Sequence, residues 1–377
     1  ETVDTGHSML SQYIEELKKD GRNTLDGETA FKLYDTYGFP VDLTIEILSE
    51  NGLNVDVDAF NKEMNEQRER ARNARNVGDD AGWSEDVFTT MDKSIKTEFI
   101  GYDLNETEAE VIAIVSKGAV CDSVSDGEDA VIITDKTVFY GEGGGQVGDK
   151  GVIYGEGFKA EVYDCKKLPD GKVLHCVAIT EGTASKGNKV TLSIDTQLRK
   201  ATERNHSATH LLQKALEEVL GDHVAQAGSF VTADRLRFDF SHFEAMTSEQ
   251  IKTVEKKVND AIYDALPVSK TLMSQSEAKK MGARALFGEK YGDVVRVVKM
   301  GDYSIELCGG CHVDNTSAIG AFKILSESSA AAGVRRIEAI TGKGVLAYLE
   351  GIEKIVASAA ELLKGTPAEI ENKKKLR

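Results

Sequence analysis

The stretch Asn205-His206-Ser207-Ala208-Thr209-His210-Leu211-Leu212 places two histidines four residues apart. It lies within a predicted helix over residues 196–220, which Asp195 or Thr196 can cap and Gly221 ends. Residues i and i+4 of a helix share one face, about 5–6 Å apart at Cβ. Two imidazoles held in this way can bind one metal ion, and the same spacing is also compatible with two surface histidines.

Ligands that would complete such a site follow about a hundred residues later, in Cys308-Gly309-Gly310-Cys311-His312. Cys308 and His312 would add a thiolate and an imidazole, and the resulting N₃S set suits tetrahedral Zn²⁺. Cys311 is an alternative ligand, because Cys308 and Cys311 form a Cys-x-x-Cys half-site. Ser207 stands where a zinc protease motif has its glutamate, so peptide hydrolysis by a helical general base is disfavoured.

The composition limits the class of protein. A length of 377 residues predicts two or three domains, and 41% hydrophobic residues suffice for packed cores without any run that could span a membrane. The net charge of −17 argues against a general nucleic-acid binder, although a local basic face is still compatible with it. Five cysteines indicate a reduced compartment. A first residue other than Met, with no leader after it, suggests part of a longer cytoplasmic protein.

The first 77 residues are predicted to be helical. One helix over 27–37 must end at Gly38-Phe39-Pro40, a second covers 41–50, and a third covers 57–76. Arg68, Arg72 and Arg75 share a face of the third helix, which could meet a phosphate backbone or be a solvated face. Residues 77–82 have the composition of a linker.

Residues 95–195 change to short β-type runs broken by Gly and Asp, which predicts a small barrel or a strongly curled sheet. The predicted strands are 111–115, 130–134, 137–140, 151–154, 158–163, 173–179 and 189–194. The glycine-rich residues 141–148 can form a tight turn or let the backbone approach a ligand, but they lack the ending of a phosphate loop. A two-residue hairpin turn at Asp170-Gly171 would set Cys165 opposite Cys176.

After the central helix the pattern is mixed. It predicts a hairpin over 228–232 and 235–241, a helix to about residue 266 opened by the capping box at Thr247, and strands at 293–299, 303–307, 320–326 and 334–341. A short helix is predicted near 275–281 and a last one over 344–363. We therefore expect an α+β fold with four regions: helical 1–77, barrel-like 78–195, a two-layer core with an antiparallel sheet at 196–342, and helical 343–377.

The two histidine motifs, taken with the Val313 that follows, resemble the two zinc motifs of the alanyl-tRNA synthetase editing domain and its free-standing relatives. Residues 31–40, 140–148, 235–242 and 332–338 also resemble this family, so the likeness covers nearly the whole chain. Threonyl-tRNA synthetase has a related editing domain, but Cys-Gly-Gly and Tyr-Gly-Phe-Pro point to the alanyl family. Cys311 stands where the family usually has Thr.

The resemblance implies zinc-dependent hydrolysis of the ester that joins a wrong serine or glycine to the acceptor end of tRNA(Ala). It implies Zn²⁺ ligands at His206, His210, Cys308 and His312, and aminoacyl recognition by Gly143, Gly144, Gly145 and Gln146. Thr209 and Cys311 would line the pocket. Candidate contacts to the acceptor-stem backbone are Arg199, Lys200, Arg204, Arg335 and Arg336. No catalytic side chain is identified; the reacting group would be a zinc-associated water.

The resemblance also implies regional roles. Residues 1–77 would recognise tRNA, 78–195 and 196–342 would form the editing domain, and 343–377 would begin a region through which the parent could form homo-oligomers. The ATP-dependent aminoacylation core is expected to precede residue 1, so ligation is not expected here. The alternative from the residues alone is a non-catalytic tRNA-binding module with a structural zinc.

Overall fold

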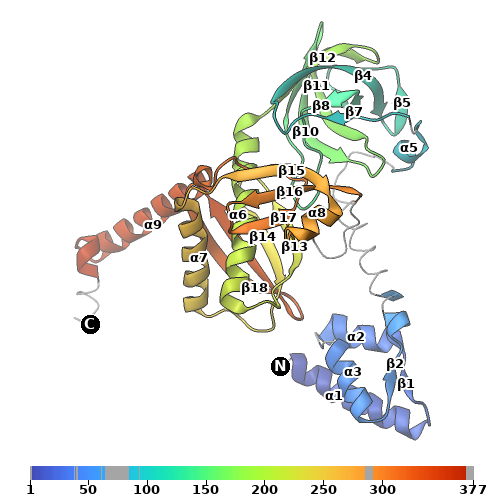
Figure 1. Cartoon of the computed structure of the whole chain (residues 1–377), viewed down its shortest axis with the longest axis vertical. Coiled ribbons are helices and arrows are strands. Elements are labelled where there is room, and N and C mark those ends of the chain that lie inside the picture. The colour runs from blue at the N-terminus through green and yellow to red at the C-terminus, as the bar shows by residue number, and fades with distance from the viewer. Residues whose placement is uncertain are drawn as a thin grey trace. The chain divides into compact units, whose positions relative to one another are not determined.

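The computed structural model describes residues 2–37, 39, 41–60, 62–63, 85–92, 94–284 and 292–370 (Figure 1). Contacts divide the chain into one unit built mainly from Glu1–Gly82 and another built mainly from Trp83–Ser241, Met246–Ser328 and Arg336–Arg377. Within the described part of the chain, every helix is too short or too polar to cross a membrane.

The first unit is helical, as predicted. It contains α1 (Thr2–Lys19), α2 (Gly27–Tyr37) and α3 (Val41–Glu50), and β1 (Thr24–Leu25) pairs in parallel with β2 (Asn54–Val55). Phe39 is buried among the helices and donates its backbone N–H to Leu33 O. Of the helix predicted over 57–76, only 57–60 and 62–63 are described; the arginine face and the linker lie outside the described residues.

The larger unit begins with α5 (Glu85–Thr90) and a closed six-stranded barrel, which confirms the predicted barrel-like region. The strands follow the order β10-β9-β12-β4-β7-β11, and β11 returns to pair with β10, antiparallel throughout. Their bounds are β4 (Glu106–Ser116), β7 (Asp129–Thr134), β9 (Gly151–Gly155), β10 (Phe158–Lys167), β11 (Val173–Ser185) and β12 (Lys189–Ile194). Alternate residues of β10 are buried, as a barrel wall requires.

Short strands surround this barrel: β3 (Glu98–Phe99) pairs with β8 (Lys136–Thr137), β5 (Ala119–Cys121) with β4, and β6 (Ser123–Ser125) with β11. The predicted strand over 137–140 is wrong beyond Thr137. The N–H of Phe139 donates to the Thr137 hydroxyl and that of Tyr140 to the Asp149 carboxylate, so neither enters a ladder.

The predicted hairpin register is also wrong. Leu168 N–H donates to Lys172 O, which makes the loop three residues long and sets Cys165 opposite His175. A one-residue shift moves a strand's side chains to opposite faces. Cys165 therefore lies in the barrel core and Cys176 in a separate outer cluster, and both are free thiols.

The core of the larger unit is built around the long helix α6 (Thr196–Leu220), whose predicted bounds are confirmed. Asp195 caps it by accepting the N–H groups of Gln197 and Leu198, and Gly221 follows its last residue. One sheet has the order β13 (Gln226–Val231), β14 (Leu236–Ser241), β19 (Val334–Thr341) and β18 (Phe322–Ala331). The buried side chains of α6, of this sheet and of α7 (Ser248–Tyr263) meet in one hydrophobic core.

A second sheet is antiparallel: β15 (Val268–Ser274), β16 (Val294–Met300) and β17 (Ser304–Leu307). The remaining elements are α8 (Gln275–Lys280), α9 (Lys343–Leu362) and two 3₁₀ turns, η1 (Thr316–Ile319) and η2 (Pro367–Glu369). The mixed α+β class is confirmed. The strand β15, in which only Val268 is buried, was not predicted from the sequence. The predicted end of α7 is also wrong, because Ala265 adopts a positive φ that a helix cannot continue.

Candidate metal centre

The two helical histidines lie on the buried face of α6. His206 and His210 are each 4% exposed, and their ring centroids are 5.6 Å apart. The same helix sends Leu211, Leu212 and Leu216 into the hydrophobic core, so packing fixes the direction of both rings. The alternative of two surface histidines is therefore wrong.

The second pair follows β17. Cys308 Sγ is 3.4 Å from His206 Nε2 and 3.3 Å from His312 Nε2, and the ligand atoms of these residues and His210 all lie within 4.8 Å of one another. Cys311 is buried but lies outside this group of four. The structure thus brings together the four residues for which the sequence predicted metal ligation.

The donor set fits a divalent metal. Burial lowers the pKa of His210 to about 3 and the pKa values of His206 and His312 well below their usual range, so all three imidazoles are neutral, as ligation requires. Burial also raises the pKa of the Cys308 thiol to about 12, so a thiolate there needs a cation beside it. His210 Nδ1 is buried and has no hydrogen-bond partner among the described residues. A metal ion would satisfy these needs together.

Gln146 fixes the protonation of His206. Its Oε1 accepts the backbone N–H of Cys311 and lies equally close, 2.8 Å, to His206 Nδ1. Because a backbone N–H can only donate, that atom of Gln146 must be the oxygen, and His206 Nδ1 must carry the proton. The lone pair of Nε2 then faces Cys308. Such outer partners orient metal ligands and set their tautomers.

The other two histidines also have outer partners. Ser207 Oγ accepts the backbone N–H of Val313 and lies 3.1 Å from His312 Nδ1. Glu306 Oε2 lies 3.6 Å from His210 Nε2, and burial raises the pKa of this carboxyl to about 7. Neither role was predicted from the sequence: Ser207 lies between the two helical histidines without a ligand atom of its own, and Glu306 belongs to no spaced motif.

The glycine-rich segment is a tight turn held against β13. Gly145 O accepts the N–H of Val231, and Val231 O accepts that of Val147. Gly145 has a φ of +81°, and a Cβ there would lie 2.6 Å from Ser229 O, so only glycine fits. The turn aims the fully buried Gln146 at His206, and Gln146 Nε2 has no partner among the described residues. A free donor beside the metal group is suited to substrate recognition.

The remaining predicted pocket and tRNA contacts differ in accessibility. Thr209 is buried and donates its hydroxyl to Asn205 O within α6. Arg199 is 3% exposed and donates to the Asp149 carboxylate, Gly101 O and Val138 O. A guanidinium so enclosed cannot reach an RNA phosphate, and we correct that expectation.

The other basic residues lie nearer the surface. Arg336 donates two hydrogen bonds to Asp239, at 2.7 and 2.8 Å. Lys200 is exposed, and Arg204 and Arg335 are partly exposed. For these three residues, contact with the acceptor stem stays a prediction. They lie on α6 and at the start of β19.

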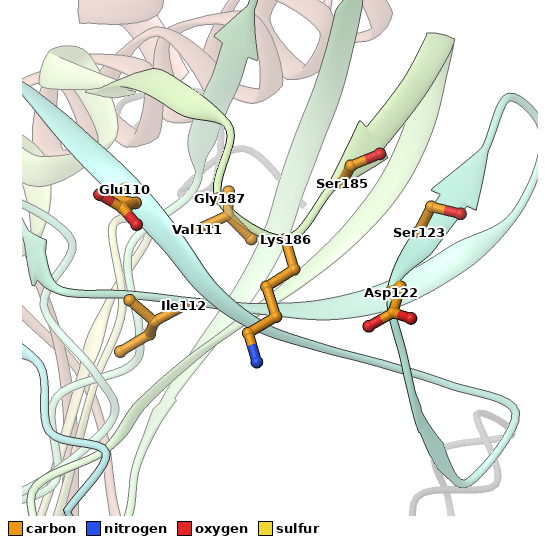
Figure 2. A pocket seen from close by; sticks show the side chains of 8 residues that line it. All are labelled: Glu110, Val111, Ile112, Asp122, Ser123, Ser185, Lys186 and Gly187. Carbon is orange, nitrogen blue, oxygen red and sulfur yellow. The ribbon is translucent and has the colours of Figure 1, made fainter.

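A depression of about 700 Å³ lies elsewhere, on the barrel surface (Figure 2). It is lined by Glu110, Val111, Ile112, Asp122, Ser123, Ser185, Lys186 and Gly187. None of these residues belongs to the metal group, and the lining carries two acids, Glu110 and Asp122, against one lysine, Lys186. The depression is therefore not a basic surface.

Two family models match the sequence. The model described as "tRNA synthetases class II (A)" matches residues 1–198, and the model described as "Threonyl and Alanyl tRNA synthetase second additional domain" matches residues 295–338. The second match covers β16, β17 and the Cys308–His312 segment. One half of the metal group thus lies within a region typical of two synthetase families.

Curated relatives agree with these models. The chain is 52% identical over 369 residues to the alanine–tRNA ligase of Acetivibrio thermocellus. The aligned residues make up 98% of this chain and 42% of that protein. It is 54% identical over 364 residues to the alanine–tRNA ligase of Alkaliphilus oremlandii, and the aligned residues make up 97% of this chain and 41% of that protein. The chain therefore spans about two fifths of the length of these relatives.

Proposed function

This chain belongs to the alanyl-tRNA synthetase family, and from that premise we propose that its barrel and core form a zinc-dependent aminoacyl-tRNA deacylase. The substrates would be Ser-tRNA(Ala) and Gly-tRNA(Ala), and the bond cleaved would be the ester to the 3′-terminal adenosine. The observation that carries the proposal is the group formed by three buried histidines, His206, His210 and His312, and the partly buried Cys308. Its neutral imidazoles and unpartnered His210 Nδ1 suit a metal ion.

A physical need for this reaction supports the proposal. Glycine differs from alanine by one missing methyl group, so an alanine pocket loses only the contacts of that methyl when it binds glycine. Serine adds a hydroxyl, which an apolar pocket also rejects only weakly. Binding alone therefore separates such substrates by roughly 10- to 200-fold, and a second, hydrolytic site can supply the rest. The acceptor end of tRNA(Ala) would bring the wrong amino acid to the metal group.

The residues have distinct roles in this proposal. His206, His210, Cys308 and His312 would hold Zn²⁺, which when bound supplies a Lewis acid toward the ester or its attacking water. Gln146 holds the proton on His206 Nδ1 and keeps its amide N–H₂ available for the aminoacyl group. Ser207 orients His312, and burial of the three histidines limits their contact with bulk water.

We further propose the regional roles expected from the sequence. Residues 1–77 would recognise tRNA, 78–195 and 196–342 would edit, and 343–377 would lead into an oligomerisation region of a cytoplasmic ligase. Attachment of alanine with ATP is a proposal for the whole ligase.

One observation favours a second candidate function. Four protein donors in one group can close a tetrahedral shell, whereas catalytic zinc normally keeps a position open. The second candidate is thus a non-catalytic tRNA-binding module with structural zinc. In the deacylase, a closed shell would shift the metal's role toward positioning the adenosine.

Release of serine from Ser-tRNA(Ala) by the purified, zinc-loaded chain separates the two. We expect release well above the rate in buffer, slower release of alanine from Ala-tRNA(Ala), and none from a small serine ester without tRNA. If serine is released no faster than in buffer, the deacylase is refuted and the non-catalytic tRNA-binding module with structural zinc is the candidate that remains. Equal hydrolysis of the small ester would instead indicate a general esterase.

A further inference from the structure

The segment that carries the thiolate ligand has little structure of its own. Cys308, Gly309 and Gly310 follow the end of β17 and belong to no helix or strand. Two successive glycines also lose more conformational entropy on ordering than any other pair. A precise position for Cys308 Sγ therefore depends on contacts from outside the segment.

Two side chains supply these contacts to three successive carbonyls. Arg296 Nη1 donates to Cys308 O at 2.9 Å and to Gly310 O at 2.8 Å. The Tyr102 hydroxyl donates to Gly309 O at 2.6 Å. Every carbonyl of the segment is thus held, and the backbone N–H of Cys308 is held as well, by Arg296 O at 3.0 Å.

The two side chains also hold each other. The Arg296 guanidinium lies over the Tyr102 ring, 4.1 Å from its centroid, and Phe99 packs edge-on against the same ring at 4.8 Å. Tyr102 lies between β3 and β4 at the barrel, and Arg296 lies on β16 of the core. A stacked guanidinium keeps its planar donors directed at fixed acceptors. The pair therefore connects the segment Cys308–Gly310 to both the barrel and the core.

The constraint reaches the sulfur through the backbone. With its carbonyls fixed, the segment directs the N–H of Gly310 at Cys308 Sγ, at a distance of 3.4 Å. A hydrogen bond from a backbone N–H favours the thiolate form and fixes its direction. The hydrogen bonds that Tyr102 and Arg296 make to this segment go to its backbone carbonyls.

We infer that Tyr102 and Arg296 are positioning residues of the metal centre, which hold Cys308 Sγ in place through the three carbonyls of Cys308–Gly310. The inference rests on the proposed metal centre and does not depend on the hydrolytic reaction. Outer partners of metal ligands typically change metal affinity by about 10- to 100-fold. Metal affinity, rather than stability alone, is therefore the property they should control.

The test measures zinc affinity by competition with a chelator in Tyr102→Phe and Arg296→Gln, and in Tyr263→Phe as control. Tyr263 is 75% exposed on α7, far in sequence from the metal ligands. We expect affinity to fall by about 10-fold or more in both variants and to stay unchanged in the control. Arg296→Lys keeps a hydrogen-bond donor but loses the stacking on Tyr102, so its zinc affinity should lie between those of the wild type and Arg296→Gln.

A spectroscopic signature distinguishes positioning from general destabilisation. With Co²⁺ in place of zinc, the thiolate-to-metal absorption of Tyr102→Phe should shift or weaken, while that of Tyr263→Phe stays as in wild type. Tyr102→Phe removes one oxygen atom, so it decides the matter even where Arg296→Gln fails to fold. Zinc affinity within twofold of wild type and an unchanged Co²⁺ spectrum in Tyr102→Phe overturn the inference. A chain that binds zinc but releases no serine contradicts only the deacylase.

Discussion

Substitution of Gly310 by alanine should destroy the metal centre by displacing His206. A Cβ on Gly310 would lie 2.0 Å from His206 Cε1 and 2.4 Å from its Nδ1. That is roughly 1.5 Å short of an ordinary carbon–carbon contact, so the ring or the segment must move by about that distance. His206 is packed within α6 and cannot retreat, and the movement also breaks its contact with Gln146.

The expected effect is large because a ligand itself is displaced. Zinc affinity should fall by at least about 100-fold, the upper end of what loss of an outer partner costs. Overpacking should also lower the free energy of unfolding of the zinc-free protein by roughly 1–3 kcal/mol. Chelator competition measures the first quantity and denaturant unfolding the second.

The neighbouring glycine provides a matched control. A Cβ on Gly309 meets no atom within 4 Å, and its carbonyl remains available to Tyr102. Gly309→Ala should therefore keep zinc affinity within a few fold of wild type, although the two variants differ by one position. If Gly310→Ala binds zinc as tightly as Gly309→Ala, the deduced packing of His206 against the segment is refuted.

Four other variants test other parts of the structure. His206→Ala with His210→Ala should remove zinc and serine release together, and full zinc by metal analysis in this double variant would rule out the assigned ligands. Cys311→Thr should keep one zinc per chain, because this thiol lies outside the group of four; loss of the metal would move the ligand to Cys311. Burial lowers the pKa of His175 to about 4, below its unfolded value near 6.5, so the unfolded chain gains a proton first as pH falls. The zinc-free protein should lose roughly 3 kcal/mol of stability between about pH 6.5 and 4 through this group, and denaturant unfolding at pH 7 and 5 should show a smaller loss in His175→Gln; an equal loss would contradict the assignment. Arg199→Met should lower the free energy of unfolding by roughly 3–5 kcal/mol, because it leaves a buried carboxylate unpaired, whereas a residue used only for phosphate contact would leave stability unchanged.

Local signals explain what the sequence could predict. The bounds of α6 follow from its apolar period and from the Asp195 cap, which both act within a few residues. The spacing of His206 and His210 needs only the geometry of one helix. The capping box at Thr247 likewise marks the start of α7.

Long-range contacts explain what the sequence could not predict. Leu198 is 39% exposed and Arg199 only 3%, the reverse of what their polarity suggests, because Asp149 lies 50 residues away in sequence and faces the first turn of α6. Tyr102 reaches Gly309 across 207 residues without any motif that links them. The edge strand β15 was not predicted because only one of its residues is buried and its sequence lacks apolar alternation.

The hydrogen bonds of Gln146 have a consequence for the order of folding. This side chain joins His206, 60 residues later, to Cys311, 165 residues later, and Cys308 meets His206 across 102 residues. Contacts of such separation form late, because large loops must close before they gain anything. An ion held by all four residues would therefore add its full stabilisation only after these long loops have closed. That stabilisation would rise with the free concentration of the metal.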